Sequence, residues 1–378
     1  MIKTISLKNI SQSFFEKSLL EGVSFKVTVD ERICIVGDNG TGKSTLLKII
    51  SGSLEPSSGT VEKTGHIRTH YVTQEFNAED TGLTIEEYIK KYASVTLFKK
   101  VFSSGLILGY NLEKNLDKNC KFLSGGQQKI LAISVGLAVA PDFLLLDEPE
   151  NHLDIVSRLE LTKLLADYRG GVLFVSHDRL MVDAVATKVA EVTNKKVYIS
   201  EGGYQDYIDN RLTRIAGMQR EFDKDARRIS QLKAMMPILE QKAFRGKETS
   251  TYQKAKAELA ELKEKQKEAP RADDTRTKIR LAKTGADFHG GKLLCRVEDA
   301  SFKYEKARGE TFKNIDLEIR TGTHIVLLGR NGSGKSTFLK CLTGNMPLTK
   351  GSISWAPDLK TSYFDQHAEF DGNKTPLQ

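Results

Sequence analysis

The chain has 378 residues, 39% of them hydrophobic and 28% charged, with a formal net charge of +8. This length allows two or three domains, while no apolar run reaches the roughly 18 to 20 residues that span a bilayer and the amino terminus lacks the pattern of a signal peptide. The four cysteines are scattered without a CxxC pair, which argues against a disulfide framework or a zinc site and fits a reducing cytoplasm best.

Short apolar strands alternate with helices in the first part of the chain. We expect strands at 32–37, 143–147 and 171–176, and helices at 42–50, 126–139 and 155–168. This alternation indicates a mainly parallel sheet with helices on both faces. The opening segments 2–7 and 23–29 predict an additional antiparallel β layer.

A glycine-rich loop joins the first of these strands to the first helix, which is the context of a phosphate-binding P-loop. Its glycines let backbone N–H groups curl around phosphate oxygens, and the helix N-terminus adds partial positive charge. Lys43 is expected to reach the β- and γ-phosphates, and the Ser44 hydroxyl to bind Mg²⁺. The expected ATP contacts of this loop are Gly37, Asp38, Asn39, Gly40, Thr41, Gly42, Lys43, Ser44 and Thr45.

Two acids stand at the end of the apolar strand 143–147. We expect Asp147 to hold Mg²⁺, directly or through water, and Glu148 to act as general base or to orient the attacking water. His177 follows the next strand and is expected to contact the γ-phosphate. These residues predict that the first half of the chain can hydrolyse ATP.

The sequence Leu-Ser-Gly-Gly-Gln at 123–127 opens a helix upstream of the acidic strand. Together with the P-loop, it makes the chain resemble the ATP-binding cassette (ABC) proteins. In that family two cassettes face each other head to tail, and the signature of one caps the nucleotide on the P-loop of the other. The resemblance implies that Gln74 lies near Mg²⁺ and the attacking water, and that Phe14 stacks on adenine. The signature residues are Ser124, Gly125, Gly126 and Gln127.

A charged segment follows the first cassette. Within it, 207–287 contains 20 Lys and Arg against 13 Asp and Glu, which is nearly all of the basic excess of the chain. A helical hairpin with a basic turn is expected because Pro237 and 244–247 interrupt two helical stripes. The alternative is a solvated linker whose charge only aids solubility. The stripes consist of Ile208, Ile215, Phe222, Ile229 and Met236, and of Tyr252, Leu259, Leu262 and Gln266.

Motifs of the first cassette recur near the end of the chain at one constant offset, which indicates a duplicated domain. The second P-loop follows an apolar segment expected to be a strand, and segments 293–297 and 315–319 predict a second antiparallel layer. Gln366 is the counterpart of Gln74, and Tyr304 stands where the family stacks an aromatic ring on adenine. Ser336 and Gln366 are the expected Mg²⁺ ligands of this copy. Its expected ATP contacts are Gly329, Arg330, Asn331, Gly332, Ser333, Gly334, Lys335, Ser336, Thr337 and Gln366.

The second copy ends soon after Gln366, so by the measure of the first copy we expect it to be truncated. The expected fold class is α/β: a P-loop ABC cassette with a parallel sheet core, an antiparallel β layer and a helical subdomain. The expected domains are this cassette at 1–203, a basic helical hairpin at 204–287, and part of a second cassette at 288–378. Neither composite ATP site is then complete, so we expect slow hydrolysis unless chains pair or a longer form exists.

The run Asp-Glu-Pro-Glu-Asn-His-Leu-Asp at 147–154 resembles the ABC-F group, which usually has Thr where Glu150 stands. We expect that departure to leave the chemistry unchanged. ABC-F proteins are cytosolic ATPases that mostly act on the ribosome, and their hairpin enters near the peptidyl-tRNA site. The resemblance therefore implies ATP and Mg²⁺ as cofactors, with ribosomal RNA and tRNA as partners. The expected RNA contacts are Arg245, Lys247, Lys254 and Lys256.

Other functions remain open at this point. The basic helices could hold duplex or branched DNA in a DNA-associated ATPase, or the chain could be the ATP-binding subunit of a membrane exporter. A non-enzymatic RNA-binding module is a further alternative. Within the ABC-F reading, translation regulation, rescue of stalled ribosomes and antibiotic protection of the ribosome are not distinguished by the sequence.

Overall fold

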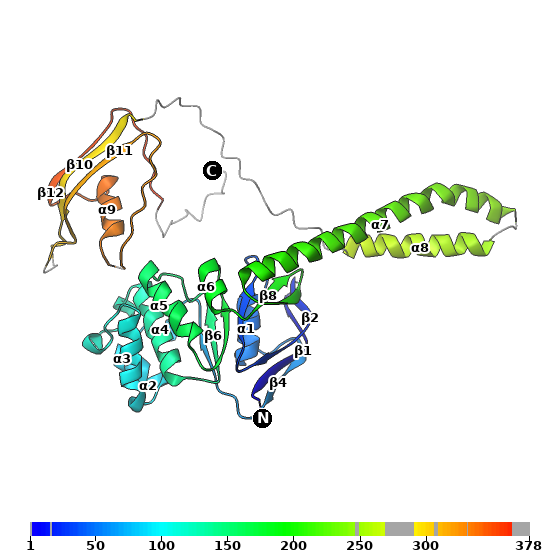
Figure 1. Ribbon diagram of the computed structural model, residues 1–378, viewed down its shortest axis with the longest axis horizontal. Coiled ribbons are helices and arrows are strands. Elements are labelled where there is room, and N and C mark those ends of the chain that lie inside the picture. The colour runs from blue at the N-terminus through cyan, green and yellow to red at the C-terminus, as the bar shows by residue number, and fades with distance from the viewer. Residues whose placement is uncertain are drawn as a thin grey trace. The chain divides into compact units, whose positions relative to one another are not determined.

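The computed structural model describes residues 2–15, 17–245, 249–268, 291–305, 309–330 and 332–364 (Figure 1). Contacts divide the chain into two compact units, Met1–Ile279 and Arg280–Gln378, and each is described here by itself. The first unit contains the first cassette and the helical segment that follows it. The second unit contains the second P-loop.

A six-stranded sheet in the order β5-β6-β7-β3-β8-β9 forms the centre of the first unit. All neighbouring pairs are parallel except β8 and β9, which are antiparallel. Every residue of β6 and β7 is buried, as expected of central parallel strands that are covered on both faces. The strands are β3 (Arg32–Val36), β5 (Thr69–Val72), β6 (Phe143–Asp147), β7 (Gly171–Val175), β8 (Lys188–Thr193) and β9 (Lys196–Glu201).

Helices cover both faces of this sheet. α1 (Lys43–Ser51) packs on one face, and α4 (Gly125–Val139), α5 (Ile155–Ala166) and α6 (Arg179–Val185) pack on the other. Successive side chains of a strand point to opposite faces of the sheet. Leu145 of β6 therefore packs in the core on the α1 side, and its neighbour Leu146 packs in the core on the side of α4, α5 and α6. The three helices predicted from the sequence agree with α1, α4 and α5 within two residues at each end.

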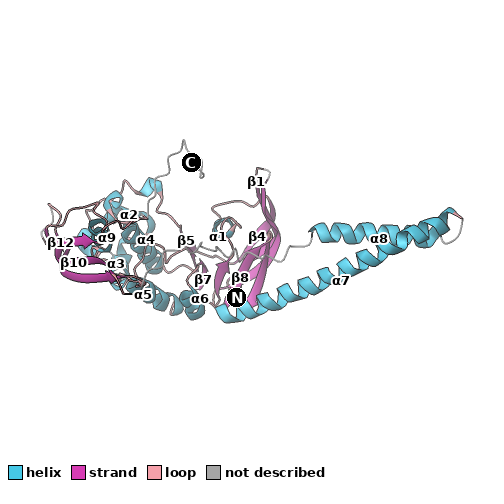
Figure 2. Ribbon diagram, turned by 90° about the horizontal axis from the view of Figure 1, so that it is seen from above, coloured by secondary structure: helices cyan, strands magenta, loops and turns pink. Residues whose placement is uncertain are grey.

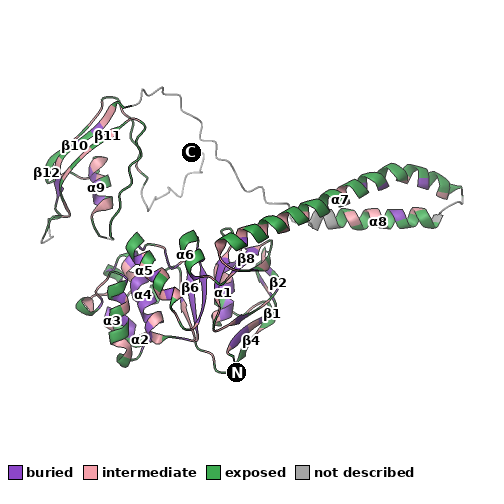
Figure 3. Ribbon diagram, viewed as in Figure 1, coloured by how far each residue is buried: buried purple, intermediate pink, exposed green. Residues whose placement is uncertain are grey.

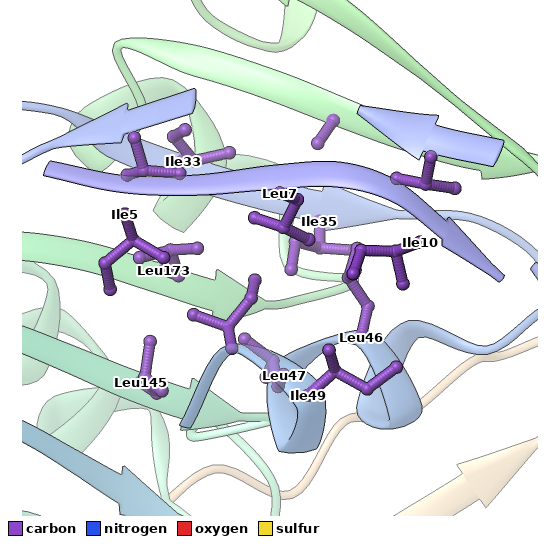
Figure 4. Packing of buried hydrophobic residues seen from close by; sticks show 14 of the residues in the cluster. Ile5, Leu7, Ile10, Ile33, Ile35, Leu46, Leu47, Ile49, Leu145 and Leu173 are labelled. Atoms are coloured by element: carbon purple, nitrogen blue, oxygen red, sulfur yellow. The ribbon is translucent and has the colours of Figure 1, made fainter. Parts of the chain in front are cut away.

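An antiparallel sheet in the order β2-β1-β4 completes the α1 side of the first unit. Ile5, Leu7 and Ile10 of β1 are buried and face Leu46 and Leu47 of α1 (Figure 4). This is the antiparallel layer expected from the opening segments, although its strands run longer than predicted. They are β1 (Thr4–Phe14), β2 (Lys17–Thr28) and β4 (Ser58–Thr64).

A small helical subdomain lies between β5 and the signature sequence. α2 (Ile85–Tyr92) begins with a capping box, in which Thr84 and Glu87 bond each other's backbone N–H. α2 and α3 (Phe98–Ile107) share a core with Leu131 and Val135 of α4. The signature helix α4 therefore joins the subdomain to the central sheet.

Two long helices project from the cassette (Figure 2). α7 (Tyr204–Phe244) and α8 (Thr249–Glu268) pack against each other through a small core that includes Leu232, Leu239 and Ala255, while most of their surface is exposed (Figure 3). We call this pair the arm. Its helices confirm the predicted hairpin, but the expected break at Pro237 was wrong. Across the described residues, no helix has the length and apolar character that crossing a membrane requires.

The helix continues through Pro237 for a local reason. Proline removes one backbone N–H and crowds the preceding turn of a helix. Pro237 and Lys233, whose carbonyl loses its helical hydrogen-bond donor, are both exposed, so water can bond that carbonyl. Leu232 and Leu239 on either side of it are buried against α8 and hold the helical path. The turn of the arm begins at Arg245, and residues 246–248 lie outside the described part of the chain.

The second unit repeats the antiparallel layer of the first. Its sheet has the order β11-β10-β12, and α9 (Lys335–Leu342) packs on it through Phe338 and Leu342. The strands are β10 (Leu293–Phe302), β11 (Phe312–Arg320) and β12 (Lys350–Trp355).

The strand predicted before the second P-loop is absent from the structure, so that prediction was wrong. Residues 323–330 form no strand, and the apolar side chains of Ile325, Val326, Leu327 and Leu328 are exposed. A strand requires neighbours that accept and donate its backbone hydrogen bonds. No described strand of this unit runs beside 323–330, whereas the corresponding β3 lies between β7 and β8.

Candidate nucleotide site

The first P-loop connects β3 to α1 at the carboxyl edge of the parallel sheet, where ligands of such sheets usually bind. Gly37 has a φ of 151°, and a Cβ on it would lie 2.4 Å from the carbonyl oxygen of Val192, so only glycine fits. Gly42 caps α1 with a φ of 103°. The loop is thus shaped by glycines at its two ends.

Lys43 is folded back onto the loop that precedes it. Its Nζ donates to the carbonyl oxygens of Gly37 at 2.8 Å and Asp38 at 2.9 Å. Burial lowers the pKa of Lys43, and the nearby carboxylates, Glu148 first, oppose that shift. The ammonium group is therefore partly desolvated and placed where an anionic ligand would replace the two carbonyl oxygens.

A pocket of about 520 Å³ opens over the P-loop, which is the size range of small-molecule sites. It brings together the P-loop, Gln74, Glu148 and His177, as the sequence predicted for the catalytic residues. Phe14 is not among its lining residues and is exposed at the end of β1. The lining consists of Leu19, Asn39, Gly40, Gly42, Lys43, Ser44, Thr45, Gln74, Glu148 and His177.

Glu148 stands immediately after β6 with a φ of 45°, a backbone conformation that non-glycine residues adopt mainly at special sites. Its Oε2 accepts hydrogen bonds from Gln74 Nε2 at 2.8 Å and from Asn151 Nδ2 at 2.5 Å. His177 Nε2 lies 4.0 Å from Glu148 Oε1. The carboxylate is held on one oxygen by amides and has its other oxygen toward the histidine.

Asp147 has the chemistry of a metal ligand. Its Oδ2 accepts from the hydroxyl of Tyr71 at 2.9 Å, while its Oδ1 is buried without a hydrogen-bond partner among the described residues. Burial, with Asp147 next to it, raises the pKa of Tyr71. A buried carboxylate oxygen without a donor suits a hard cation, and Mg²⁺ takes few protein ligands besides phosphate and water. The described residues hold no cluster of three or more His, Cys, Asp and Glu that could bind a metal alone.

Lys129 of α4 connects the signature helix to the catalytic residues, and the sequence did not reveal it. Its buried Nζ donates to the carbonyl oxygens of Thr73 and Gln74, both at 2.9 Å, and to that of Asp147 at 3.1 Å. Burial lowers the pKa of Lys129 to about 8, although Asp147, Glu150 and Glu148 oppose the shift. One ammonium group thus ties the Gln74 loop and the end of β6 to α4.

Glu150, which stands where the ABC-F group usually has threonine, makes structural contacts of its own. It is buried, and its Oε1 accepts from the Ser176 hydroxyl at 2.7 Å and from the backbone N–H of His177 at 2.9 Å. Its Oε2 is buried without a hydrogen-bond partner among the described atoms. Glu150 therefore holds the loop that carries His177. Its place directly after Asp147, Glu148 and Pro149 was the only sequence signal of this role.

The signature residues form the exposed start of α4, apart from the pocket lining. Ser124 and Gln127 make a capping box, in which the Ser124 hydroxyl accepts from the N–H of Gln127. Ser124 and Gly125 are exposed, while Gly126 is buried. The start of α4 thus reaches the surface at Ser124 and Gly125, while the N–H of Gln127 is bonded within the capping box.

The second P-loop repeats the local geometry of the first. Lys335 Nζ donates to the carbonyl oxygens of Gly329 at 2.8 Å and Arg330 at 2.9 Å. Gly334 caps α9 with a φ of 91°, as Gly42 caps α1. Tyr304 shares a 2.9 Å hydrogen bond with the hydroxyl of Thr337. Asn331 and Gln366, both predicted site residues, lie outside the described residues.

Three of the four expected RNA contacts are described. Arg245 lies at the end of α7, Lys254 and Lys256 lie on α8, and all three are exposed. Lys247 lies outside the described residues.

Taken together, the parallel sheet, the two glycine-capped phosphate loops and the acid-tipped strand beside the first define a P-loop nucleotide-binding protein. A family model described as "ABC transporter" matches residues 20–151 and 312–376, which is about half of the chain. The chain belongs to the ATP-binding cassette family, within it to the ABC-F group represented by relatives that match nearly its whole length.

Three relatives illustrate the match. The ATP-binding protein Uup of Buchnera aphidicola subsp. Acyrthosiphon pisum is 31% identical over 99% of this chain and 62% of its own length. The Haemophilus influenzae protein of the same name is 29% identical over 99% and 62%. The ribosome protection protein VmlR of Bacillus subtilis is 29% identical over 97% and 66%. The chain thus spans about two thirds or less of the length of these relatives.

Among solved structures, the chain is similar to a nucleotide-free ATP-binding cassette from an ABC transporter. The sequences are 21% identical, the match covers 56% of this chain and 95% of the other, and the TM-score is 0.47.

Proposed function

We propose that the protein is an ABC-F ATPase that uses ATP binding and hydrolysis to control its engagement with the ribosome. The observation that carries this proposal is the arm: two long helices, with 13 Lys and Arg against 10 Asp and Glu, rise from a cassette that contains a P-loop, an acidic strand end and a histidine. Phosphate-rich RNA is a suitable partner for a projecting basic arm. The name of the Bacillus subtilis relative supports the ribosome as the source of that RNA.

The first cassette has a residue for each step of hydrolysis. Lys43 and the P-loop amides would hold the β- and γ-phosphates. Glu148 would accept a proton from water or orient it, with Gln74 fixing the carboxylate and His177 meeting the γ-phosphate. Bound Mg²⁺ would neutralise phosphate charge during the transfer. The metal would be held by Ser44, Asp147 and Gln74, and in the second copy by Ser336 and Gln366.

The exposed start of α4 is the natural cap for a second nucleotide. Its glycine N–H groups and the Ser124 hydroxyl would meet the γ-phosphate on a P-loop of a facing cassette, in the same protein or in another chain. ATP then becomes part of the interface between cassettes, and loss of its γ-phosphate opens that interface. In the closed state the arm is held for RNA binding, and after hydrolysis the protein is released.

The division into a cassette at 1–203, a basic helical hairpin at 204–287 and a second cassette from 288 belongs to this proposal, as does a cytoplasmic site of action beside the ribosome. Within it, Arg245, Lys247, Lys254 and Lys256 contact RNA phosphates. Translation regulation, rescue of stalled ribosomes and protection from antibiotics all use the same cycle. Hydrolysis by the 378-residue chain alone is expected to be slow because each ATP site needs a signature from a facing cassette.

The test is co-sedimentation with ribosomes in ATP or ADP, using Glu148→Gln and a control, Glu113→Gln. Glu113 is an exposed acid away from the pocket. Glu148→Gln keeps the hydrogen-bonding shape but removes the base, so we expect hydrolysis to fall by about 100-fold or more and ribosome binding in ATP to persist. The control should behave as the wild type.

Under conditions in which the wild type hydrolyses ATP, unchanged turnover in Glu148→Gln would contradict the role of Glu148. Equal ribosome binding in ATP and ADP would contradict the two-state cycle. Adding duplex DNA as a competitor separates the alternative of a DNA-associated ATPase, because that protein would leave the ribosome for the DNA at equal phosphate concentration.

A further inference from the structure

A buried acid at the base of the arm lies beside the first P-loop. Glu191 is in β8 and is 3% exposed. Its Oε1 accepts from Tyr207 Oη at 3.1 Å and pairs with Arg211 Nε at 2.9 Å, and its Oε2 pairs with Arg214. These three partners are spaced along one face of the first turns of α7. A single strand residue thus holds the arm through charge-assisted hydrogen bonds.

The same strand residue is the immediate neighbour of the P-loop. In the parallel pairing of β3 and β8, Glu191 is opposite Val36, the last residue before the loop. The next residue, Val192, lies so close to Gly37 that its carbonyl oxygen would clash with any Cβ there. A shift of the P-loop at Gly37 therefore presses on Val192, whose neighbour Glu191 anchors the arm.

A bound nucleotide would act on the P-loop at this point. Lys43 Nζ bonds the carbonyl oxygens of Gly37 and Asp38, and phosphate oxygens compete for the same ammonium group. Changing these bonds changes the forces on Gly37, which touches Val192. The route from the ligand to α7 therefore consists of only a few packed residues.

A cavity of about 280 Å³ is shared by the P-loop and the base of the arm. It is lined on one side by Gly37, Asp38 and His177, and on the other by Tyr204, Tyr207 and Arg211 of α7. Tyr204 is also held from α6, because its N–H donates to Asp183 Oδ1 at 2.8 Å. The base of the arm is thus part of the wall behind the P-loop and the histidine.

We propose that Glu191 is a positioning residue that transmits the nucleotide state of the first P-loop to the arm. It acts through Tyr207, Arg211 and Arg214 and touches no nucleotide itself. This inference rests on ATP binding at the first P-loop, as proposed above, and does not depend on the ribosome. We call the contacts of Glu191 with Tyr207, Arg211 and Arg214 the clamp. The inference predicts that weakening the clamp removes the response of the arm to ATP, although ATP still binds.

The experiment measures a distance in the isolated protein. All four natural cysteines are buried, so spin labels can be directed to Ser230→Cys on α7 and Lys99→Cys on α3, which are both exposed. At about 1.5 Å per residue, position 230 lies about 40 Å along α7 from its start, so a rotation of about 5° at the base moves it by about 3–4 Å. Pulsed electron resonance with and without Mg-ATP would detect this change.

Two variants weaken the clamp from opposite sides, and a third is matched to one of them. Glu191→Gln removes the buried charge, Arg211→Gln removes one partner on the arm, and Arg220→Gln makes the same charge change at an exposed site farther along α7. We expect the ATP-dependent shift to fall by at least half in the first two and to remain in the third. Arg211→Lys, which keeps the charge, should restore part of it.

ATP affinity is measured on the same samples with a fluorescent analogue and is expected to change less than about threefold. If ATP binds and the shift is equal in every variant, or is absent in the wild type, the coupling is wrong while the nucleotide site stands. Lower melting temperatures with an unchanged shift would mean that Glu191 is only structural, which also overturns the inference. Absence of ATP binding by the wild type would instead contradict the proposed function, and the coupling with it.

Discussion

Buried charged side chains organise the first nucleotide site, and two of them bind backbone groups of the protein. Lys129 donates to three carbonyl oxygens, and Glu150 accepts from Ser176 and from the N–H of His177. A buried charge is tolerated when it is hydrogen-bonded. These two residues hold the Gln74 and His177 loops around the pocket.

The role of Glu150 can be tested by separating its hydrogen bonds from its charge. Glu150→Ala would leave the Ser176 hydroxyl and the His177 N–H buried without an acceptor, so we expect a loss of about 2–3 kcal/mol in unfolding free energy. Glu150→Gln retains an acceptor oxygen of the same shape and should lose less than about 1 kcal/mol. Hydrogen exchange of the buried β6 and β7 amides measures both. Equal losses would show that the negative charge is what matters.

At the scale of elements, the sequence predicted most where local pattern and tertiary packing agree. β6 and β7 are continuous apolar runs because both faces of the sheet are covered. α1 begins at a glycine-rich loop whose P-loop motif is recognisable in the sequence. The proposed nucleotide contacts rest on these motifs. Lys129, Glu150 and Glu191 could not be found in this way, because a buried charge looks like a surface charge until its distant partners are known.

The failures at this scale have physical causes as well. Pro237 was expected to stop a helix, but its own side is exposed and its neighbours are packed against α8, so tertiary contacts outweighed the local preference. The apolar residues before Gly329 were expected to form a strand. A strand cannot form from its own pattern alone, and no described strand lies beside them.

Two neighbouring residues of the arm differ strongly in burial, so the same substitution can be compared at a buried and at an exposed position. Leu239 is 6% exposed in the core between α7 and α8, whereas the preceding Ile238 is 60% exposed. Leu239→Ala should destabilise the arm by about 2–3 kcal/mol because it leaves a cavity between the helices. Ile238→Ala should change it by less than about 0.5 kcal/mol.

Hydrogen exchange of the α8 amides reports this local stability separately from that of the cassette. Faster exchange in α8 is expected for Leu239→Ala alone, with β6 and β7 unchanged. Equal exchange in the two variants would mean that α7 and α8 do not depend on each other, and the arm would then be two independent helices.

At the scale of the whole molecule, the repeat and the charge distribution were readable from the sequence because both are sums over many residues. The duplicated P-loops and the basic excess of 207–287 needed no knowledge of contacts. Net charge alone gives every basic protein some affinity for RNA. The proposed function requires more: the charge must act from the arm.

That requirement can be tested with two variants of equal net charge. One variant carries Arg245→Gln, Lys254→Gln and Lys256→Gln on the arm, and the other carries Lys26→Gln, Lys63→Gln and Lys100→Gln on the cassette surface. All six residues are exposed, and both variants have a formal net charge three units below the wild-type value of +8. Ribosome affinity is measured by co-sedimentation in ATP over a range of salt concentrations.

Each lost phosphate contact makes the plot of log affinity against log salt shallower by about 0.7–0.9. The arm variant should therefore lose about 2 units of slope and at least tenfold in affinity at low salt, whereas the cassette variant should keep the wild-type slope. If both variants lose the same slope, the protein is attracted only through its overall charge. In that case the arm has no privileged contact with RNA, because binding would depend on how many charges the surface carries and not on where α7 and α8 hold them.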